Sequence, residues 1–152
     1  MNLFVRSVAP RSRCGDNGCM VLESVHVSTT IDRPADEVYA YAADPRNLSH
    51  WAAGLAHQEV ELVDGAWVVD SPMGRVTVDF APPNAFGVLD HEVTLPTGEA
   101  VSNPMRVIPN GDGCDVLFTV RRRDGVSVNE FADDTKAVAA DLATLRDVMQ
   151  RA

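Results

Sequence analysis

The sequence lacks the features that bring a protein to a membrane or to a nucleic acid. No apolar run approaches the roughly 20 residues that a helix needs to cross a bilayer. Basic residues are scarce, because 13 Lys and Arg stand against 22 Asp and Glu and the formal net charge is −9. The only cationic run is Arg121–Arg123, whereas a surface that tracks phosphates needs clustered cations. We therefore expect neither a membrane nor a nucleic acid as a partner.

Cysteine is scarce as well. The three cysteines are an odd number, which suits a reducing compartment better than a disulfide framework. The first residues do not form a signal peptide, because Arg6 interrupts a short apolar run. These observations predict a cytoplasmic protein.

Signatures of cofactors and metals are also missing. The segment Gly111–Gly113 lacks the helix and the spacing that dinucleotide binding needs. Cys14 and Cys19 could pair or bind a metal, but no histidine lies near them to complete a zinc site. We therefore assign no cofactor and no metal ligand.

The length and composition predict one globular domain. A chain of 152 residues buries roughly 68–70% of its unfolded surface, which is enough for one core with a cavity. Its hydrophobic content of 45% is that of a folded protein. Residues 1–20 contain Pro10, Gly15 and Gly18 and no sustained periodicity, so we interpret them as a flexible N-terminal extension. Residues 21–152 form the single domain.

Alternating β-branched residues predict a first strand over 23–31. Two short helices follow, the first opened by Pro34 and the second by Asp44 and Pro45, ending near Trp51. Six further strands are predicted over 57–63, 66–71, 74–81, 87–95, 99–108 and 114–122.

The last segment changes to a helical period. Apolar residues from Phe131 to Met149 recur at steps of four and three, which predicts a long amphipathic helix. A curved antiparallel sheet needs one face covered, and only this helix is long enough to cover it. The expected class is α+β, with a seven-stranded curved antiparallel sheet wrapped around the C-terminal helix and two short helices between the first two strands.

Two proline-containing turns fix the predicted register. Ser71–Gly74 and Leu95–Gly98 each place Pro and Gly where a three-residue hairpin loop has them. The pairs that follow are Val68 with Val78, Val93 with Val101, His91 with Asn103 and Leu89 with Met105.

A third turn, Asp64–Gly65, is ambiguous. A two-residue loop would turn Glu59 and Glu61 into the core, whereas a three-residue loop turns Val60 and Leu62 there. Because burying two unpaired carboxylates is costly, we predict the three-residue loop.

Particular stretches resemble a known family. They are Ile31–Val38, Asp44–Leu48 leading to Trp51, and the final helix with Val138, Asp141, Leu142 and Leu145. Together they resemble the SRPBCC superfamily of START-like, helix-grip proteins, and within it the polyketide cyclase/dehydrase branch. The resemblance implies a ligand cavity between the sheet and the C-terminal helix, with its mouth near the two short helices. Because this fold hosts carriers, cyclases, receptors and co-chaperones, the fold alone does not assign an activity.

The predicted inner face of the sheet is aliphatic, and three polar residues interrupt it: Asp70, His91 and Asn103. Convergent polar groups in an apolar concavity are typical of a small-molecule site. We take His91 as a candidate general base and Asn103 as its neighbour that binds a carbonyl. The candidate ligand-binding residues are Trp51, Asp70, Val78, Phe80, Leu89, Met105, Phe118, Phe131, Val138 and Leu142.

Each of these interpretations has a structural alternative. His91 and Asn103 could satisfy each other across the sheet, or cap the end of a filled core, without touching a ligand. Asp70 lies next to a turn, where a charged residue is commonly solvated. Trp51 could form the lid or wall of the cavity, or pack in the core.

Three functions fit the sequence. The first is binding of a hydrophobic or aromatic small molecule, with cofactor-independent polyketide cyclase or dehydratase chemistry as its catalytic form. The second is a non-catalytic carrier or sensor of a lipid or small ligand. The third is a co-chaperone-like interaction module, in which Trp67 and Val69 point outward and contact a partner or a second copy in a homodimer.

Overall fold

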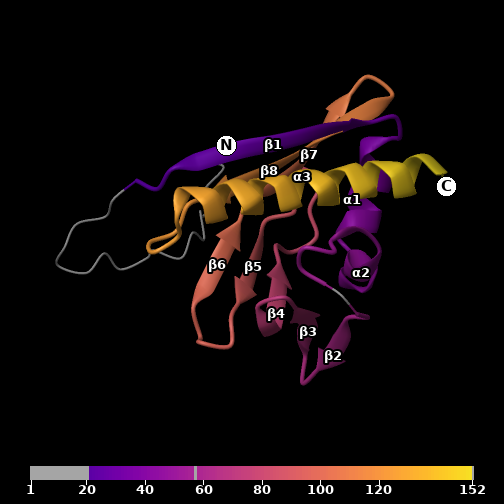
Figure 1. Ribbon diagram of the computed structural model, residues 1–152. Coiled ribbons are helices and arrows are strands. Elements are labelled where there is room, and N and C mark those ends of the chain that lie inside the picture. Colours follow the sequence, from indigo (N-terminus) through magenta and orange to yellow (C-terminus); the bar gives the residue numbers. More distant parts are fainter. Residues whose placement is uncertain (1–20, 57, 152) are drawn as a thin grey trace, which may run out of the picture.

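The computed structural model describes residues 21–56 and 58–151 (Figure 1). In chain order the elements are β1 (Ser24–Ile31), α1 (Ala35–Ala42), the 3₁₀ helix η1 (Pro45–Asn47), α2 (Leu48–Trp51), β2 (Glu61–Val63), β3 (Ala66–Ser71), β4 (Gly74–Phe80), β5 (His91–Thr94), β6 (Ala100–Asn103), β7 (Met105–Asn110), β8 (Gly113–Arg121) and α3 (Val128–Arg151). The predicted extension over 1–20, with Cys14 and Cys19, lies outside the described residues.

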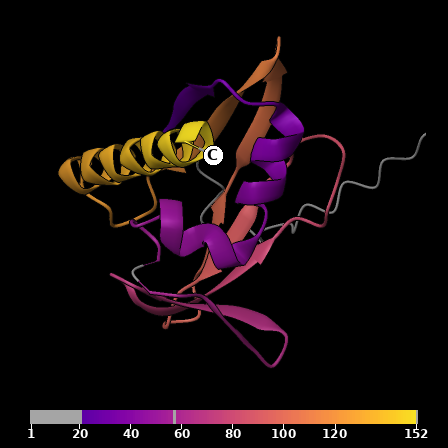
Figure 2. The same ribbon diagram turned by 90° about the vertical axis from the view of Figure 1, so that its right-hand side faces the viewer.

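Two antiparallel sheets wrap around α3, which confirms the predicted α+β class. One sheet has the order β1-β8-β7 and the other β2-β3-β4-β5-β6. Figure 1 shows β1 running alongside α3 and the five-stranded sheet crossing beneath it. Figure 2, which looks at the C-terminal end of α3, shows the short helices beside that end. Along the chain that the structure describes, no helix is long and apolar enough to span a bilayer.

The prediction of one seven-stranded sheet is wrong, because the predicted strand 99–108 is divided at Pro104. This proline separates β6 from β7, and its carbonyl accepts a hydrogen bond of 2.9 Å from the Thr119 amide. Proline has no amide hydrogen to donate to a ladder, so the pairing breaks there. The chain consequently leaves the larger sheet after β6 and joins the smaller sheet as β7.

The segment 87–95 is extended as predicted, but only its second half pairs as a strand. Before β5 begins, a single bridge joins Val88 to Arg106. Hydrogen bonds of 2.9 Å from Leu89 N to Met105 O and from Val107 N to Gly87 O reinforce it. This stretch therefore ties the larger sheet to β7.

The two short helices begin close to where the sequence predicts. Pro34 is the N-cap residue of α1 and not its first helical residue. Asp44 caps η1 as predicted, because its Oδ1 accepts the Arg46 amide at 3.0 Å. The second helix ends at Trp51, as predicted.

The predicted register is confirmed for one hairpin. β5 and β6 pair His91 with Asn103 and Val93 with Val101. The loop closes through a hydrogen bond of 2.8 Å from Leu95 N to Glu99 O.

The predicted register of β3 and β4 is wrong by one residue. Ser71 pairs with Gly74, so the loop has two residues and not three. The Ser71 hydroxyl stabilises this tight turn, because it donates to Gly74 O at 2.8 Å and accepts from Met73 N at 3.1 Å. As a consequence Val69, which is 1% exposed, and Trp67 lie on the inner side of the sheet. The outward surface predicted for Trp67 and Val69 does not exist.

The same shift also changes the side of the sheet on which Asp70 and Val68 lie. Asp70 pairs with Arg75 on the outer side of the sheet and is exposed. Val68 lies on that outer side as well and is half-buried. Asp70 is therefore not one of the polar residues that interrupt the inner face.

The turn between β2 and β3 also has two residues. Val63 pairs with Ala66, and Asp64 and Gly65 both have positive φ angles of 50° and 82°. This is the pattern of a tight hairpin turn whose twist matches that of the strands. Three-residue loops were predicted in both hairpins, and the two one-residue errors have opposite effects on the facing of β2. Leu62 therefore lies on the inner side as predicted, but at the sheet margin, where it is 59% exposed.

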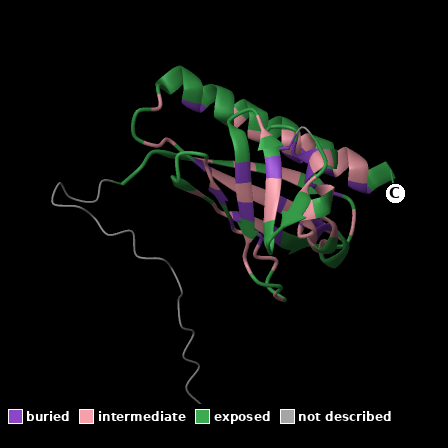
Figure 3. Cartoon of the chain, turned by 90° about the horizontal axis from the view of Figure 1, so that it is seen from below, coloured by how far each residue is buried: buried purple, intermediate pink, exposed green. Residues whose placement is uncertain are grey.

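The core lies between α3 and the inner faces of the sheets. The buried residues of α3 are Phe131, Leu142, Leu145 and Met149. Along β4 and β5 buried residues alternate with more exposed ones, and Figure 3 shows buried bands that cross the strands. α3 contacts β1, β8 and α2. These contacts leave the part of α3 around Val138 and Asp141 facing a pocket.

Candidate functional site

A pocket of about 680 Å³ lies between the sheets and α3. Its sheet wall comes from β5, β6 and β8, and its helical wall from α2 and α3. The residues used below to describe it are Trp51, Gly54, His91, Val101, Asn103, Phe118, Val138, Asp141 and Leu142.

The structure brings half of the predicted site residues together. Those that line the pocket are Trp51, His91, Asn103, Phe118, Val138 and Leu142. The predicted ligand-binding residues that are instead buried in the hydrophobic core are Val78, Leu89, Met105 and Phe131. Phe80 is half-buried, and its ring is tilted by 34° against the His91 ring. Asp70 lies outside the pocket, on the opposite side of the sheet.

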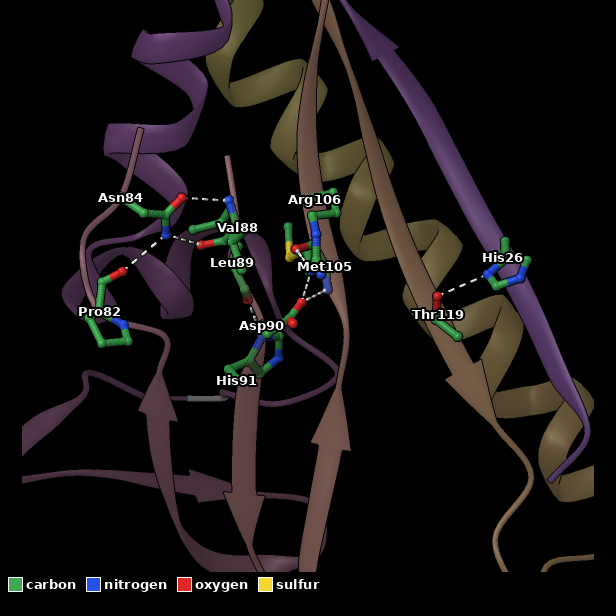
Figure 4. A network of polar contacts seen from close by, with 10 residues as sticks. All are labelled: His26, Pro82, Asn84, Val88, Leu89, Asp90, His91, Met105, Arg106 and Thr119. Carbon is green, nitrogen blue, oxygen red and sulfur yellow. Dashed lines mark hydrogen bonds and ion pairs between the residues drawn. The ribbon is translucent and has the colours of Figure 1, made fainter. Parts of the chain in front are cut away.

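His91 begins β5 and is 7% exposed. Its ring contacts two aromatic rings, with centroid distances of 4.9 Å to Phe80 and 5.6 Å to Phe118. Its Nδ1 lies 2.9 Å from the carbonyl oxygen of Leu89 (Figure 4). A carbonyl oxygen only accepts hydrogen bonds, so Nδ1 carries the proton. Nε2 is therefore the nitrogen with the lone pair whenever the ring is neutral.

Burial keeps the His91 ring neutral. Desolvation lowers the pKa of His91 below 6.5, against the smaller opposing effects of the Leu89 hydrogen bond and the Asp90 charge. A neutral imidazole at pH 7 can accept a hydrogen bond or a proton at Nε2. The structure thus combines a basic nitrogen with an apolar wall.

Asn103 lies opposite His91 on β6, but the two side chains do not satisfy each other. Asn103 Nδ2 donates to the carbonyl of Val101 at 3.1 Å, and His91 bonds to Leu89, so each uses a backbone carbonyl two residues earlier. The alternative of a self-satisfied pair is therefore wrong. Within the described residues, Asn103 Oδ1 and one amide hydrogen have no hydrogen bond, so this side chain can bind a ligand group.

An ion pair outside the pocket fixes the strand that carries His91. Asp90 Oδ1 accepts from Met105 N at 2.9 Å and forms an ion pair with Arg106 (Figure 4). On the other side Asn84 Oδ1 accepts from Val88 N at 3.0 Å. These contacts hold the backbone before β5 against β7 and against the preceding loop.

Asp141 on α3 is a pocket residue that the sequence prediction missed. Its Oδ1 accepts a hydrogen bond of 3.3 Å from the Gly54 amide. Desolvation raises its pKa from 3.8 to about 6, although the Gly54 hydrogen bond lowers it. Because the folded protein holds this proton more tightly than the unfolded chain does, ionisation of Asp141 lowers the stability of the fold as the pH rises above about 4 toward 6.

A signal for Asp141 is present in the sequence. Val138, Asp141, Leu142 and Leu145 follow the spacing i, i+3, i+4, i+7, which places Asp141 on the apolar stripe of the helix. An acid at such a position faces the core or a cavity in the core.

Trp51 combines the two roles that the sequence left open. It is 4% exposed and belongs to the hydrophobic core, and it also lines the pocket. Its indole Nε1 is buried and has no hydrogen-bond partner among the described residues. The described part of the chain contains no group of three or more His, Cys, Asp or Glu that could hold a metal ion.

The fold is similar to that of known structures with low sequence identity. XoxI from Bacillus cereus superposes with a TM-score of 0.67 at 12% identity, over 84% of this chain and 95% of that chain. The Zhui aromatase/cyclase from a Streptomyces species superposes with a TM-score of 0.63 at 18% identity, over 86% of this chain and 95% of that chain. No curated protein sequence matches the chain.

A family model matches residues 23–151, which is most of the chain. The family is described as polyketide cyclase / dehydrase and lipid transport. The match confirms the resemblance inferred from the sequence. The chain belongs to this polyketide cyclase/dehydrase and lipid-transport family.

Proposed function

We propose that the chain binds a mainly apolar small molecule in the pocket between the sheets and α3. The observation that carries this proposal is the buried, neutral His91 ring, whose Nδ1 proton is held by Leu89 O in a pocket with mainly apolar walls. Apolar walls provide affinity, and a few polar groups fix the orientation of a ligand. His91 Nε2 and the Asn103 amide are those groups on the sheet wall.

The chemistry that fits these groups is proton removal from an enolisable substrate. Nε2 of His91 takes a proton from the carbon next to a carbonyl, and the electron pair of that C–H bond moves toward the carbonyl oxygen. The free amide hydrogen of Asn103 donates to that oxygen and stabilises the enolate. Cyclisation and dehydration of polyketide-like substrates both begin with such a step, and it transfers no electrons to a cofactor.

A carrier of a lipid or small ligand is the second candidate. The description of the family includes lipid transport, and a carrier would use the same pocket without a chemical step. The co-chaperone-like alternative has less support. Its proposed contact surface included Val69, which is buried, and its collapsed cavity disagrees with a pocket of about 680 Å³.

The exchange of a ligand's acidic hydrogens for deuterium tests both forms of the proposal. The probe is β-tetralone, a bicyclic, mainly apolar ketone with an activated C–H group next to its carbonyl. We expect the protein to bind β-tetralone and to accelerate exchange in D₂O, followed by proton NMR. Since a positioned general base contributes about 10²–10⁴-fold, His91→Gln is expected to lower the exchange rate by at least about 100-fold.

The two candidates separate in the same experiment. Binding without accelerated exchange would assign the chain as a carrier. Equal exchange rates for the wild type and His91→Gln would exclude His91 as the base. If β-tetralone, tetralin and dodecanol all failed to bind at their solubility limits, a pocket for apolar small molecules would be contradicted.

A further inference from the structure

The helical wall of the pocket carries a carboxylate that the sheet-side chemistry does not use. Asp141 receives one hydrogen bond of 3.3 Å, from the Gly54 amide. Within residues 21–56 and 58–151 Asp141 forms no ion pair, and burial and the Gly54 hydrogen bond are the causes of its pKa shift. Gly54 covers the carboxylate so closely that a Cβ at this position would lie 2.9 Å from Asp141 Oδ2. The carboxylate is therefore half-buried and has acceptor sites left over.

The charges around the pocket do not supply the missing cation. The other titratable groups that line it are His91 on β5, Glu99 in the β5–β6 hairpin, Arg121 on β8, Arg123 and Asp124 after β8, and Asp134 on α3. Arg123 is engaged in an ion pair of 3.1 Å with Glu99. Since His91 is neutral, the charged groups among the described lining residues are four carboxylates and two guanidinium groups. The pocket has an excess of negative charge that a cationic ligand would reduce.

An aromatic ring lies in the same wall. Trp51 ends α2, three residues before Gly54, and lines the pocket. The aromatic ring provides an apolar and π-rich surface beside the segment that covers Asp141. Cations are attracted to the faces of such rings.

We propose that Asp141 is the counter-ion for a protonated amine, so that the pocket selects apolar ligands that carry an ammonium group over neutral or anionic ones. The inference rests on the proposed function, because it names the ligand class of the same pocket. Asp141 determines specificity here, whereas His91 acts on the opposite wall. A hydrogen bond to a charged group in a partly desolvated site adds about tenfold or more in affinity.

A matched ligand series tests this selectivity. β-Aminotetralin, β-tetralol and the corresponding tetralin carboxylate share one apolar body and differ in one polar group. We expect wild-type protein to bind the amine at least about tenfold more tightly than the alcohol, and the carboxylate most weakly. Asp141→Asn should remove the preference, so that the amine and the alcohol bind with affinities within about twofold of each other.

Asp133→Asn is the matched control. It removes the same charge from the same helix at an exposed position outside the pocket lining. We expect it to keep the preference for the amine, because surface charges are screened.

Measuring the affinity for the amine at several pH values tests the role of Asp141 in the wild-type protein, without a substitution. The amine stays protonated between about pH 5 and about pH 7.5. Asp141 ionises in this range because its pKa is about 6. Affinity for the amine should therefore rise about tenfold from the lower to the higher pH, and affinity for the alcohol should not change.

The outcomes separate the inference from the function on which it rests. If the alcohol binds but the amine binds no more tightly, or if Asp141→Asn keeps the preference, Asp141 is not the counter-ion and the proposed function stands. If none of the three ligands binds, the proposed pocket function fails and the inference with it. A preference for the amine that is lost in Asp141→Asn and at low pH supports the inference.

Discussion

Gly87→Ala is expected to lower the free energy of unfolding by about 3 kcal/mol or more, because the backbone of β7 leaves no room for a side chain there. Gly87 has a φ of +69°, and a Cβ at this position would lie 2.0 Å from the carbonyl oxygen of Val107. Both Gly87 and Val107 are fixed, since Val107 N donates to Gly87 O at 2.9 Å. Urea denaturation of the two proteins measures the loss.

Gly98→Ala is the matched control for this prediction. Gly98 also has a positive φ of +88°, but a Cβ at this position would meet no heavy atom within 4 Å beyond its chain neighbours. We expect this substitution to cost about 1–2 kcal/mol, from the backbone conformation alone. Equal losses in the two variants would show that Gly87 does not pack against β7, and the position of the strand that carries His91 would then be wrong.

Val101→Trp is expected to lower the affinity for β-tetralone by at least about 100-fold, because the indole would occupy the space of the ligand. Val101 is half-buried on β6 and lines the pocket, and its strand partner is Val93. Calorimetric titration measures the affinity. Circular dichroism shows whether the variant is folded.

Glu92→Trp places the same side chain on the other face of the sheet. Glu92 is exposed on β5, outside the pocket lining. We expect the affinity of this variant to stay within about twofold of the wild type, since exposed substitutions have small effects. Unchanged binding by a folded Val101→Trp variant would place the ligand outside the pocket.

Two similar turns show what the sequence can predict about register. Ser71–Gly74 and Leu95–Gly98 both contain Pro and then Gly, and the sequence predicts the same three-residue loop for both. The second turn is as predicted, but in the first the Ser71 hydroxyl stabilises a two-residue turn. The first turn also packs against the second, because a Cβ on Gly74 would lie 3.1 Å from Pro96. A contact between two turns that are distant in the chain cannot be predicted from the local sequence pattern of either turn.

The division of the sheet was detectable in the sequence. Pro104 lies inside the predicted strand 99–108, and proline cannot donate to a ladder. The alternation of apolar residues continues through it, so one strand was predicted where the chain moves between two sheets. Sequence pattern gives the direction of side chains, whereas the identity of the neighbouring strand depends on long-range packing.

The site was predictable on the sheet wall and less so on the helical wall. Turn geometry placed His91 opposite Asn103, and the structure agrees. Their hydrogen bonds to backbone carbonyls could not be predicted, because these depend on side-chain rotamers. Asp141 was missed because acids on an amphipathic helix are assigned to its solvent face, although its spacing from Val138 and Leu145 places it on the apolar stripe.

Nitrogen-15 NMR of the histidine rings during titration with β-tetralone tests the central claim most directly. In the free protein at pH 7 we expect His91 to be neutral, with its proton on Nδ1, and we expect its Nε2 resonance to shift as the ligand binds. His26 on β1, whose Nδ1 bonds to the Thr119 hydroxyl at 2.9 Å, is the internal reference and should not respond (Figure 4). A cationic His91 at pH 7, or an Nε2 resonance that stays unchanged when the protein is saturated with β-tetralone, would contradict a ligand site built around this ring.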